Sequence, residues 1–353
     1  MIPFEHLGAT GQVKAAFRRV GRKLEKRGRR CALGRVVSLD RGFPLVRTEY
    51  DEERAELSAS IKKSNDSIVA VGDWVAVERP DSHEKAILHA VLPRTTELAR
   101  VKRVGREKQL RRQVLAANVD TVFICQSLTG IGLDRRLLIR QMAAVMGCGA
   151  KAVFVLTKSD LVSREVVDGA MGEIAAVAPD IPLAVISKHD SDSVGRVREL
   201  IVPGTTSLLL GESGVGKSSL VNALLGSEAA DVGCVRESDD RGRHTTVARR
   251  MLEVPGAGLI IDAPGLRTLQ ILDMDASLKR AFPDIANAAG ACKFRDCSHN
   301  DEPGCAVRAA VESSELTPER YASYQALQQE MAAMRDRREE ARRMNKEKVS
   351  DTK

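Results

Sequence analysis

A run of eight residues beyond the middle of the chain has the types and spacing of a phosphate-binding loop. It fits the pattern G-x-x-x-x-G-K-[ST] at every fixed position, follows an apolar run and precedes a helix-like one. Its glycines let backbone N–H groups close around phosphate oxygens without a clash of Cβ atoms. Lys217 would add a positive charge at the β- and γ-phosphates, and Ser218 would hold Mg²⁺. The residues expected to bind the phosphates are Gly211, Glu212, Ser213, Gly214, Val215, Gly216, Lys217, Ser218 and Ser219.

A second motif, the four residues TKSD, indicates which base is bound. It ends an apolar run and fits [NT]-K-x-D, a guanine-reading pattern. Asp160 can accept two hydrogen bonds, from the ring N–H and the exocyclic amine of guanine, which adenine does not offer. Lys158 would lie along the base, and Thr157 would connect this loop to the phosphate loop. The residues predicted to bind the base are Thr157, Lys158, Ser159 and Asp160, with Ser187 and Lys188 from the loop after the next apolar run.

A third motif, Asp262-Ala263-Pro264-Gly265, also follows an apolar run. Asp262 would bind Mg²⁺ through a water molecule, and the N–H of Gly265 would contact the γ-phosphate. The next residue is Leu266, at a position where many GTP-hydrolysing proteins carry a Gln that orients the attacking water. Because an apolar side chain cannot orient water, we expect slow hydrolysis that needs a rearrangement induced by a partner.

The polar stretch between the phosphate loop and Asp262, residues 227–247, is where a switch segment must lie. Thr245 or Thr246 would complete the Mg²⁺ shell when GTP is bound, and the pattern leaves both open. His244 is a candidate for positioning the water, and an exposed loop histidine is the alternative. The predicted Mg²⁺ ligands, with Thr246 as the working choice, are Ser218 and Thr246. The predicted catalytic residues are Lys217, Ser218, Asp262, Gly265 and His244.

The order of these motifs is unusual. The guanine motif precedes the phosphate loop by about fifty residues, whereas an ordinary GTPase has the phosphate loop first. Both motifs can serve one site if the chain is circularly permuted, which a parallel sheet tolerates when its ends lie close together. The segment after Asp262 then leads directly into the C-terminal part of the chain, so the nucleotide state can be passed to that part.

Three cysteines and one histidine lie within fourteen residues, in the pattern Cys292-x4-Cys297-x-His299-x5-Cys305. Three thiolates and an imidazole match a structural, tetrahedral Zn²⁺ site. Little apolar sequence surrounds them, so metal binding would fold this segment. Four protein ligands leave no open position, which argues against a catalytic zinc. A redox or disulfide role is the alternative, but the odd total of seven cysteines and the lack of a secretory signal favour thiols or metal ligands.

The elements that must position these motifs change in type along the chain. Val- and Ile-rich runs punctuated by Gly, Pro, Asn and Asp predict short strands at 34–39, 67–70, 73–78 and 86–92. Several short strands so close together are typical of a small barrel, for which an OB-fold is the first choice and an SH3-like barrel the alternative. A charged connector is expected over residues 100–113.

Strands and helices then alternate, which predicts a parallel sheet with right-handed crossovers. The expected strands are 119–126, 152–157, 182–187, 204–210, 252–254 and 259–262; the expected helices are 134–146, 165–177 and the run after the phosphate loop. Beyond residue 272 strand signals vanish, and a long polar helix is expected over about 318–348. The fold class is therefore multidomain α/β. Its expected parts are a basic N-terminal extension (1–33), an OB-fold β-barrel (34–100), a circularly permuted P-loop GTPase domain (112–271) and an α-rich, zinc-binding C-terminal domain with a basic helical tail (272–353).

Taken together, these motifs resemble those of RsgA (YjeQ), a bacterial family of GTPases that depend on the small ribosomal subunit. The resemblance extends from about residue 34 to the C-terminal helix. It is carried, in family order, by VGDWV (71–75), LPR…ELAR (92–100), QVLAANVD (113–120), TKSD, GESGVGKSS, GRHTT, DAPG and the cysteine cluster. The resemblance implies the three domains named above, binding to the 30S subunit and its 16S rRNA, GTP hydrolysis stimulated by that subunit, and a role in its late maturation.

The chain departs from the family pattern at three places. Thr157 stands where Asn is usual, and its hydroxyl should preserve guanine selectivity. Ala263 stands where Thr is usual, a modest loss of hydrogen bonding in that loop. Ser187-Lys188 lacks the Ala of the usual S-A-K, which puts the contact with the guanine carbonyl in doubt. The basic N-terminal segment is also poorly covered by the resemblance.

Charge and composition indicate the kind of partner. The net charge is +7, and residues 14–30 carry nine Lys/Arg against the single acid Glu25, which points to a polyanion; solvated helix faces are the alternative. Aromatic residues make up only 3% of the chain, which disfavours a protein that stacks single-stranded bases. Contacts with the phosphates of folded ribosomal RNA fit better.

The same composition bears on location and on competing functions. No apolar run is long enough to span a bilayer and the N-terminus lacks a secretory pattern, so we expect a cytoplasmic monomer without membrane contact. The alternative to an RNA-dependent enzyme is an RNA-binding module that uses GTP only as a conformational latch, which Leu266 keeps open. A weaker alternative is an ATP-using protein, which Asp160 argues against.

Overall fold

The computed structural model describes residues 2–40, 43–63, 69–80, 84–104, 109–130, 132–226, 249–263, 266, 269–271 and 273–350. Its N-terminal segment begins with the short helix η1 (Phe4–Leu7) and continues with α1 (Gly11–Glu25). Thr10 caps α1, since its hydroxyl accepts a hydrogen bond from the N–H of Val13 at 3.3 Å. The basic N-terminal extension is thus helical over residues 11–25.

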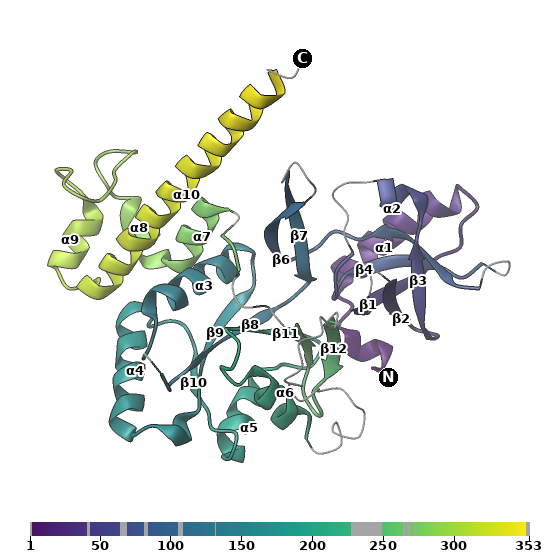
Figure 1. The fold of residues 1–353 in the computed structure, drawn as a ribbon, viewed down its shortest axis with the longest axis horizontal. Helices are drawn as coiled ribbons and strands as arrows, with labels where there is room; N and C mark the ends of the chain where they lie inside the picture. Colours follow the sequence, from purple (N-terminus) through teal and green to yellow (C-terminus); the bar gives the residue numbers. More distant parts are fainter. Residues whose placement is uncertain are drawn as a thin grey trace.

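Five strands form a closed barrel, drawn in purple to blue in Figure 1. They are β1 (Ala32–Asp40), β2 (Phe43–Thr48), β3 (Glu52–Leu57), β4 (Trp74–Glu78) and β5 (Ala86–Val91), with the short helix α2 (Ala59–Lys63) between β3 and β4. The strand order is β1-β2-β3-β5-β4, and β4 pairs again with β1 to close the barrel. Only β3 and β5 run parallel. This five-stranded Greek-key arrangement is the OB-fold, and it excludes the SH3-like alternative.

Two of these strands were absent from the sequence prediction, which also placed a strand at 67–70. In β3 only Ala55 is fully buried, Leu57 packs partly buried against the barrel core, and the other four side chains are charged, so no hydrophobic alternation marks the strand. In β2, Pro44 interrupts the pattern. Val69 and Ala70 are buried but belong to no strand, and residues 67 and 68 lie outside the described part of the chain.

The charged connector expected over residues 100–113 is wrong, because the chain there forms a two-stranded antiparallel ribbon. Its strands are β6 (Glu97–Val104) and β7 (Gln109–Ala117), which project from the body of the molecule in Figure 1. Buried residues at its base, Leu98 and Leu115, anchor it in the core. The backbone N–H and C=O groups of each strand form hydrogen bonds with the other strand. The projecting end therefore needs no apolar face, and its sequence lacks the apolar alternation that predicts a strand.

The nucleotide motifs lie on a second, mostly parallel sheet covered by helices on both faces. Its strands are β8 (Thr121–Ser127), β9 (Lys151–Thr157), β10 (Leu183–Val185), β11 (Thr206–Leu210), β12 (Arg249–Glu253) and β13 (Leu259–Asp262). The accompanying helices are α3 (Arg135–Gly147), η2 (Ser159–Leu161), α4 (Arg164–Val177), α5 (Ser191–Glu199) and α6 (Lys217–Leu225). One hydrophobic cluster packs α3 and α4 against the sheet, and another packs α5 and α6.

The strand order of this sheet is β10-β9-β8-β11-β13-β12. Chain order therefore begins in the middle of the sheet with β8, moves to the β10 edge, and returns to the centre with β11. One expectation is corrected: β12 is antiparallel to β13, not parallel. Only residues 254–258 connect the two strands, a link that suits a hairpin and is too short for a crossover.

The barrel and the sheet are joined into one continuous sheet, because β12 also pairs with β1 of the barrel. A buried arginine reinforces the junction. The Arg35 guanidinium donates to the carbonyl of Leu7, to the carbonyl of Asn118 (3.1 Å) and to the hydroxyl of Thr206 (2.9 Å), and it stacks 4.9 Å from the Trp74 ring. It thus connects the N-terminal segment, the barrel and the strand that leads to the phosphate loop.

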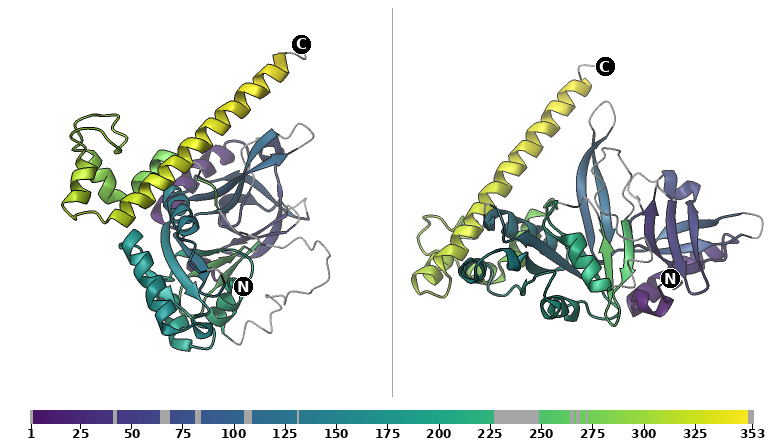
Figure 2. Two further views of the ribbon diagram at one scale, coloured as in Figure 1. Left: turned by 60° about the vertical axis from the view of Figure 1, so that its left-hand side comes forward. Right: turned by 60° about the horizontal axis from the view of Figure 1, so that its bottom comes forward.

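The elements of the C-terminal part are all helices among its described residues, and a loop that carries the cysteine cluster lies between α8 and α9. Its helices are α7 (Met274–Ala281), α8 (Pro283–Ala289), α9 (Ala306–Glu312) and the 33-residue α10 (Pro318–Ser350). Helix α7 packs against α3, so closely that Ser277 occupies the space that a side chain at Gly147 would need. The end of α10 extends beyond the body of the molecule in all three ribbon views (Figures 1 and 2). None of the described helices is both long and apolar enough to cross a lipid bilayer.

Candidate functional site

The predicted phosphate loop lies between the end of β11 and the start of α6. Gly214 and Gly216 have φ values of 80° and 98°, in the left-handed region that favours glycine, so the GxGK spacing is required by the backbone. The ammonium group of Lys217 donates to the carbonyls of Gly211 and Glu212, each at 2.6 Å. Lys217 thus reaches back over the loop, where its charge can meet phosphate oxygens. The N–H groups at the start of α6 complete an anion site.

The guanine motif and the phosphate loop are in direct contact. The buried hydroxyl of Thr157, at the end of β9, donates to the carbonyl of Val215 at 2.5 Å, and it lies 3.3 Å from the carbonyl of Gln126. Thr157 therefore connects the base-reading loop to the phosphate loop across β8, as its place in the motif suggested. Both motifs belong to one site although about fifty residues separate them in the chain.

A cavity of about 140 Å³ lies between these two loops and has the place expected for the base. Its lining comes from the guanine motif, the loop after β10, α5 and α6; these residues are Thr157, Lys158, Asp160, Leu161, Ile186, Lys188, Val194, Gly216, Ser219, Leu220 and Ala223. Mostly apolar walls with an acid at the rim suit a flat, hydrogen-bonding base. The sequence motifs did not reveal the apolar walls, because Leu161, Val194 and Ala223 are ordinary helix and loop residues by type.

The acid at this rim is held by the neighbouring loop. The hydroxyl of Ser187 donates a hydrogen bond to the Asp160 carboxylate, which lowers the pKa of that carboxyl below its usual range. Ser187 in turn accepts a hydrogen bond from the N–H of His189 (3.1 Å), and its own N–H donates to Ser193 of α5 (3.2 Å). The Ser187-Lys188 loop is thus adjacent to the base cavity, and Asp160 is ionised and ready to accept.

The third motif lies beside the phosphate loop, since β13 and β11 are neighbouring parallel strands. Burial raises the pKa of Asp262, and the nearby ammonium group of Lys217 offsets part of that rise. Leu266 is only 5% exposed, and its backbone is held by the N–H of Gly211 and the carbonyl of Ala263. Its side chain is in the core and cannot position water. Gly265, His244, Thr245 and Thr246 lie outside the described residues.

The cysteine cluster has the geometry of a four-ligand metal site. One ligand atom from each of Cys292, Cys297, His299 and Cys305 lies within 4.8 Å of the others. The Nδ1 atom of His299 is 3.6 Å from the sulfur of both Cys292 and Cys305. A tetrahedral Zn²⁺ with bonds of about 2.3 Å to sulfur and about 2.0 Å to nitrogen places such atoms about 3.6 Å apart. The residues present therefore fit zinc, and among the described residues they form the one such group.

The loop that carries these ligands is supported from two sides. Tyr321 on α10 donates its hydroxyl to the carbonyl of His299, and Gln325 donates to the side chain of Asn300 (2.9 Å). Within the loop, the Glu302 carboxylate accepts hydrogen bonds from Ser298 and from the N–H of Asn300. These donors hold the pKa of Glu302 at about 2. Hydrogen bonds around the ligands orient them for a metal ion.

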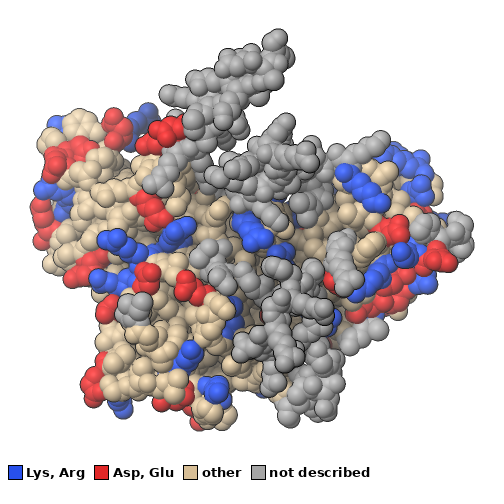
Figure 3. Space-filling view, in the orientation of Figure 1, with Lys and Arg blue, Asp and Glu red and all other residues tan. Residues whose placement is uncertain are grey.

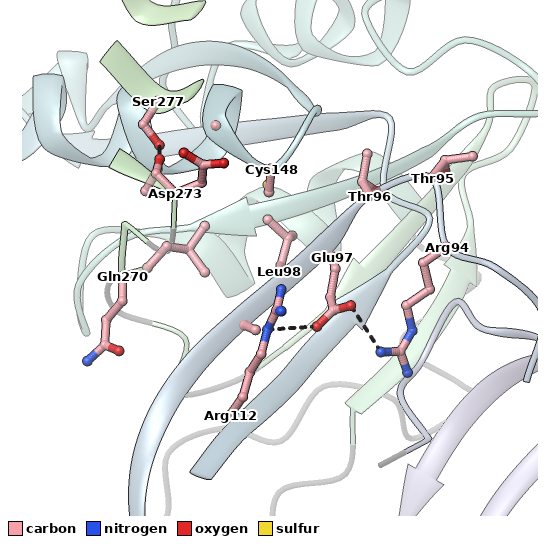
Figure 4. Close-up of a pocket in the computed structure, with 14 residues that line it drawn as sticks. Arg94, Thr95, Thr96, Glu97, Leu98, Arg112, Cys148, Gln270, Asp273 and Ser277 are labelled. Atoms are coloured by element: carbon pink, nitrogen blue, oxygen red, sulfur yellow. Dashed lines mark hydrogen bonds and ion pairs between the residues drawn. The ribbon is translucent and has the colours of Figure 1, made fainter. Parts of the chain in front are cut away.

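A second cavity, of about 200 Å³, lies apart from the nucleotide site, between the base of the ribbon, the end of α3 and the start of α7. Figure 4 shows Glu97 at its edge between two arginines, 3.3 Å from Arg94 and 3.0 Å from Arg112. Arg94 also forms a bidentate pair with the buried Asp73 of the barrel. Arg94, Glu97 and Arg112 are thus paired, and these pairs connect the ribbon with the barrel.

The fold and the two sites together define a class of protein. A P-loop sheet whose chain order runs from the guanine strand to the phosphate strand, joined to an OB barrel and followed by a Cys₃His cluster, is a circularly permuted GTPase. Residues 91–272 match the family described as RsgA GTPase. The protein named small ribosomal subunit biogenesis GTPase RsgA in Opitutus terrae is 43% identical over 277 residues, 75% of this chain and 73% of the relative. Its namesake in Streptomyces coelicolor is 39% identical over 84% of this chain and 80% of the relative.

The chain therefore belongs to the RsgA GTPase family. Solved structures agree with this assignment. The crystal structure of YjeQ from Thermotoga maritima matches with a TM-score of 0.64 and 25% identity, over 83% of this chain and 96% of that one. The structure of YloQ, described as a circularly permuted GTPase, matches with a TM-score of 0.63 and 24% identity, over 87% and 96%. The permuted fold predicted from motif order is confirmed.

Proposed function

We propose that this protein hydrolyses GTP while bound to the small ribosomal subunit and acts in the maturation of that subunit. The observation that carries the proposal is the single site in which the Thr157 hydroxyl joins the guanine loop to the phosphate loop at Val215. The curated relatives, named for small ribosomal subunit biogenesis, support the choice of partner. Leu266, buried where a water-orienting Gln is usual, supports dependence on that partner.

We assign the following roles at the nucleotide site. Asp160 reads guanine, and Lys217 stabilises the charge that develops on the transferred phosphoryl group. Mg²⁺ would bind to Ser218, to Thr245 or Thr246, and through water to Asp262. When bound, the ion would supply further positive charge at the phosphates. Gly265 and His244 keep their predicted roles at the γ-phosphate and at the attacking water.

The cysteine cluster would hold one structural Zn²⁺. Three thiolates and the Nδ1 atom of His299 would be its four ligands, and four protein ligands would leave no position for substrate. The segment around the cluster has little apolar core of its own, so the metal contributes directly to its folding. The contacts from α10 then fix this folded loop against the rest of the helical part.

The proposed RNA-contacting parts are the basic ones. The sequence places Lys and Arg in clusters on α1, on the projecting ribbon of residues 97–117 and towards the end of α10. Contacts with phosphates of the 16S rRNA would supply most of the affinity and make it sensitive to salt. We place the protein in the cytoplasm as a monomer. We retain domain limits near residues 33, 100–112 and 272, with the ribbon between the barrel and the GTPase domain.

The proposal is tested by GTP turnover with and without purified small subunits. We expect subunits to accelerate hydrolysis by wild-type protein, and Lys217→Ala and Ser218→Ala to abolish that acceleration. Arg164→Ala, on the outer surface of α4, is the matched control and should behave as wild type. Absence of any acceleration would refute the ribosome-dependent part, and unchanged turnover in the Lys217 and Ser218 variants would show that this site is not the catalyst.

One observation favours a second function, in which GTP is only a conformational latch on an RNA-binding module. The side chain of Leu266 is buried, so the described part of the site holds no group in its place to orient water. A latch would hold RNA differently with GTP and GDP but would show no turnover on the subunit. Loss of hydrolysis in the Lys217→Ala variant would exclude the latch.

A further inference from the structure

The cavity beside the ribbon lies between two parts of the molecule. On one side is the base of the ribbon, with Leu98 and Arg112. On the other side are the end of α3, with Cys148, and the start of α7, with Asp273 and Ser277. Figure 4 shows the ribbon and these two helix ends on opposite sides of the opening. Its volume of about 200 Å³ is unusual, because protein interiors leave few voids larger than a water molecule.

The helical side of the cavity is packed onto the GTPase sheet. Ser277 of α7 is 1% exposed and fills the space beside Gly147 of α3. Arg280 of α7 donates to the carbonyls of Met146 (3.1 Å) and Gly147 (3.3 Å). Helix α3 in turn packs on the sheet through the main hydrophobic cluster. The start of α7 therefore forms one unit with the GTPase sheet.

The ribbon side of the cavity is attached to the barrel. Arg94, just before the ribbon, pairs with the buried Asp73 at 2.7 and 2.8 Å. Asn118, just after the ribbon, donates to the carbonyl of Gly72 at 2.9 Å and accepts from the N–H of Thr95 at 3.0 Å. The barrel and the ribbon, residues 32–117, are therefore a second unit.

The two units meet at a narrow junction. The chain crosses between them at residues 118–120, and Asp120 is held to the GTPase sheet because its carboxylate accepts the N–H of Thr206 at 2.7 Å. Asn118, at the other end of the crossing, has a φ of 53°, in the left-handed region. Strands β1 and β12 add two described residue pairs, and Arg35 adds its buried hydrogen bonds. Such a junction holds the units together and lets them rotate about it.

Charge does not set the width of the cavity. The ion pairs of Glu97 with Arg94 and Arg112 lie within the barrel and ribbon and do not cross the cavity. On the face shown in Figure 3, acidic and basic side chains are mixed over both units. No large field of one sign on that face therefore draws the units together or drives them apart.

The third wall of the cavity is the segment that leads from the third nucleotide motif to α7. Leu269, which lines the cavity, and Ile271 are each 2% exposed, and Asp273 caps α7 through its carboxylate. Three residues before Leu269, the carbonyl of Leu266 accepts a hydrogen bond from the N–H of Gly211 in the phosphate loop. The wall of the cavity is thus a few residues along the chain from a direct contact with the phosphate loop.

We propose that this cavity is a clearance in which the barrel and ribbon rotate as one unit against the GTPase sheet and α7. The nucleotide at the phosphate loop sets the width of the cavity through the segment that ends at Asp273. Where it concerns the ribosomal subunit, the proposal rests on the proposed function, because the rotation changes how the barrel and the helical part together hold RNA. It assigns a role to a cavity outside the nucleotide and metal sites.

The thiol of Cys148 reports the width of the cavity in the wild-type protein. It lines the cavity and is half-buried, and burial raises its pKa, so its rate of reaction with a maleimide follows its exposure. The rate is measured by mass analysis of the Cys148 peptide, with GDP and with a non-hydrolysable GTP analogue. We expect the two rates to differ several-fold, while Cys31, half-buried in the barrel part, reacts alike with both nucleotides. Equal rates at Cys148, or a matching change at Cys31, would overturn the proposal.

The variant Ala144→Leu fills part of the cavity from α3. We expect it to keep the melting temperature and GTP affinity of the wild type, because the added side chain enters empty space. The dissociation constants of its complex with the small subunit, with the GTP analogue and with GDP, should come within about twofold of each other. Ala175→Leu adds the same volume on the exposed face of α4 and should keep the wild-type ratio. A wild-type ratio in the Ala144 variant would overturn the proposal, and if that variant does not fold, the labelling of wild-type Cys148 decides.

Failure of this proposal is distinguishable from failure of the proposed function. If Cys148 reacts equally with both nucleotides while subunits accelerate GTP turnover, the clearance alone is refuted. If subunits do not accelerate turnover, the proposed function fails. The labelling experiment contains no subunits, so it still decides whether the nucleotide sets the width of the cavity.

Discussion

We expect selectivity for guanine to depend on Asp160 and the residues that hold it. Ser187 donates to its carboxylate and keeps it ionised, while Thr157 holds the loop against the phosphate loop. The carboxylate can accept from both the N1–H and the exocyclic amine of guanine, and a charged acceptor makes these hydrogen bonds strong. Adenine has neither donor in that position. The lining of the cavity is otherwise mostly apolar, so we expect this one side chain to carry the discrimination between bases.

The Asp160→Asn variant should therefore lose GTP affinity by about 100-fold or more, because its amide N–H₂ would face the amine of guanine. Xanthine carries a carbonyl in place of that amine and can accept from the new amide. We expect xanthosine triphosphate to regain much of the lost affinity in competition binding. Asp192→Asn, on the exposed start of α5, is the control. Unchanged GTP affinity in the Asp160 variant would show that another group reads the base.

The predicted metal ligands of the cysteine cluster can also be tested one residue at a time. Replacing Cys292 by Ser should lower the bound zinc from one ion per chain to well below one and lower the melting temperature of the helical part, because the ion holds that segment together. Metal analysis and circular dichroism with and without a chelator measure both effects. Cys31→Ser, at a half-buried position in the barrel part, should leave both unchanged. Full zinc content in the Cys292 variant would refute the assigned ligand set.

At the scale of elements, Arg320 docks α10 onto the rest of the protein. It is buried, forms a bidentate pair with Asp284 of α8, and donates to the carbonyl of Val177 at the end of α4 (2.7 Å). Thr317 adds a hydrogen bond to the carbonyl of Ala176 (2.9 Å). The helical part is therefore attached to the helix that follows the guanine motif.

We expect Arg320→Ala to destabilise this attachment by about 3 kcal/mol, at the low end for a broken buried pair because Asp284 is partly exposed. Arg335 also lies on α10 and forms an exposed ion pair with Asp275 of α7. Its replacement by Ala should cost less than about 1 kcal/mol. Hydrogen exchange of α8 and α10 amides measures the difference. Similar protection in the two variants would mean that other contacts dock α10.

The elements and motifs that could be predicted from the sequence are those with a local pattern. The phosphate loop, the guanine motif and the cysteine cluster are set by short local patterns, and the structure brings each set together. Helices α3, α4, α6 and α10 were predicted because their apolar spacing or their length is a local property. Strand β3 and the ribbon of β6 and β7 were missed because distant backbone pairing, not side-chain pattern, makes them strands.

Arg35 is a single residue whose role could not be predicted from the sequence. In sequence it is one more cation in a basic N-terminal part, but in the structure it is the buried centre of the junction. Burial lowers its pKa to about 10, which still leaves it protonated at neutral pH. Its acceptors come from residues as distant as Leu7 and Thr206, so no local pattern could indicate them. The missed features are thus contacts between parts of the chain that are far apart in sequence.

At the scale of the molecule, permutation places the parts that we propose to bind RNA next to the nucleotide site. Asp262, Arg250 and Ser38 lie in register across β13, β12 and the barrel strand β1. The barrel is thus two strands from the motif that begins at Asp262. On the other side, the chain after Asp262 leads directly to α7 and the metal cluster. We expect a change at the γ-phosphate to alter how both parts hold RNA, and RNA binding to alter the nucleotide site in return.

The most direct test is the dissociation constant of the protein–subunit complex, measured with a non-hydrolysable GTP analogue and with GDP. Because coupling between two binding sites is reciprocal, we expect the two constants to differ by about 5- to 150-fold, and the subunit to change nucleotide affinity by the same factor. Equal constants with both nucleotides, from a protein that binds the subunit, would contradict the coupling of the permuted GTP site to RNA.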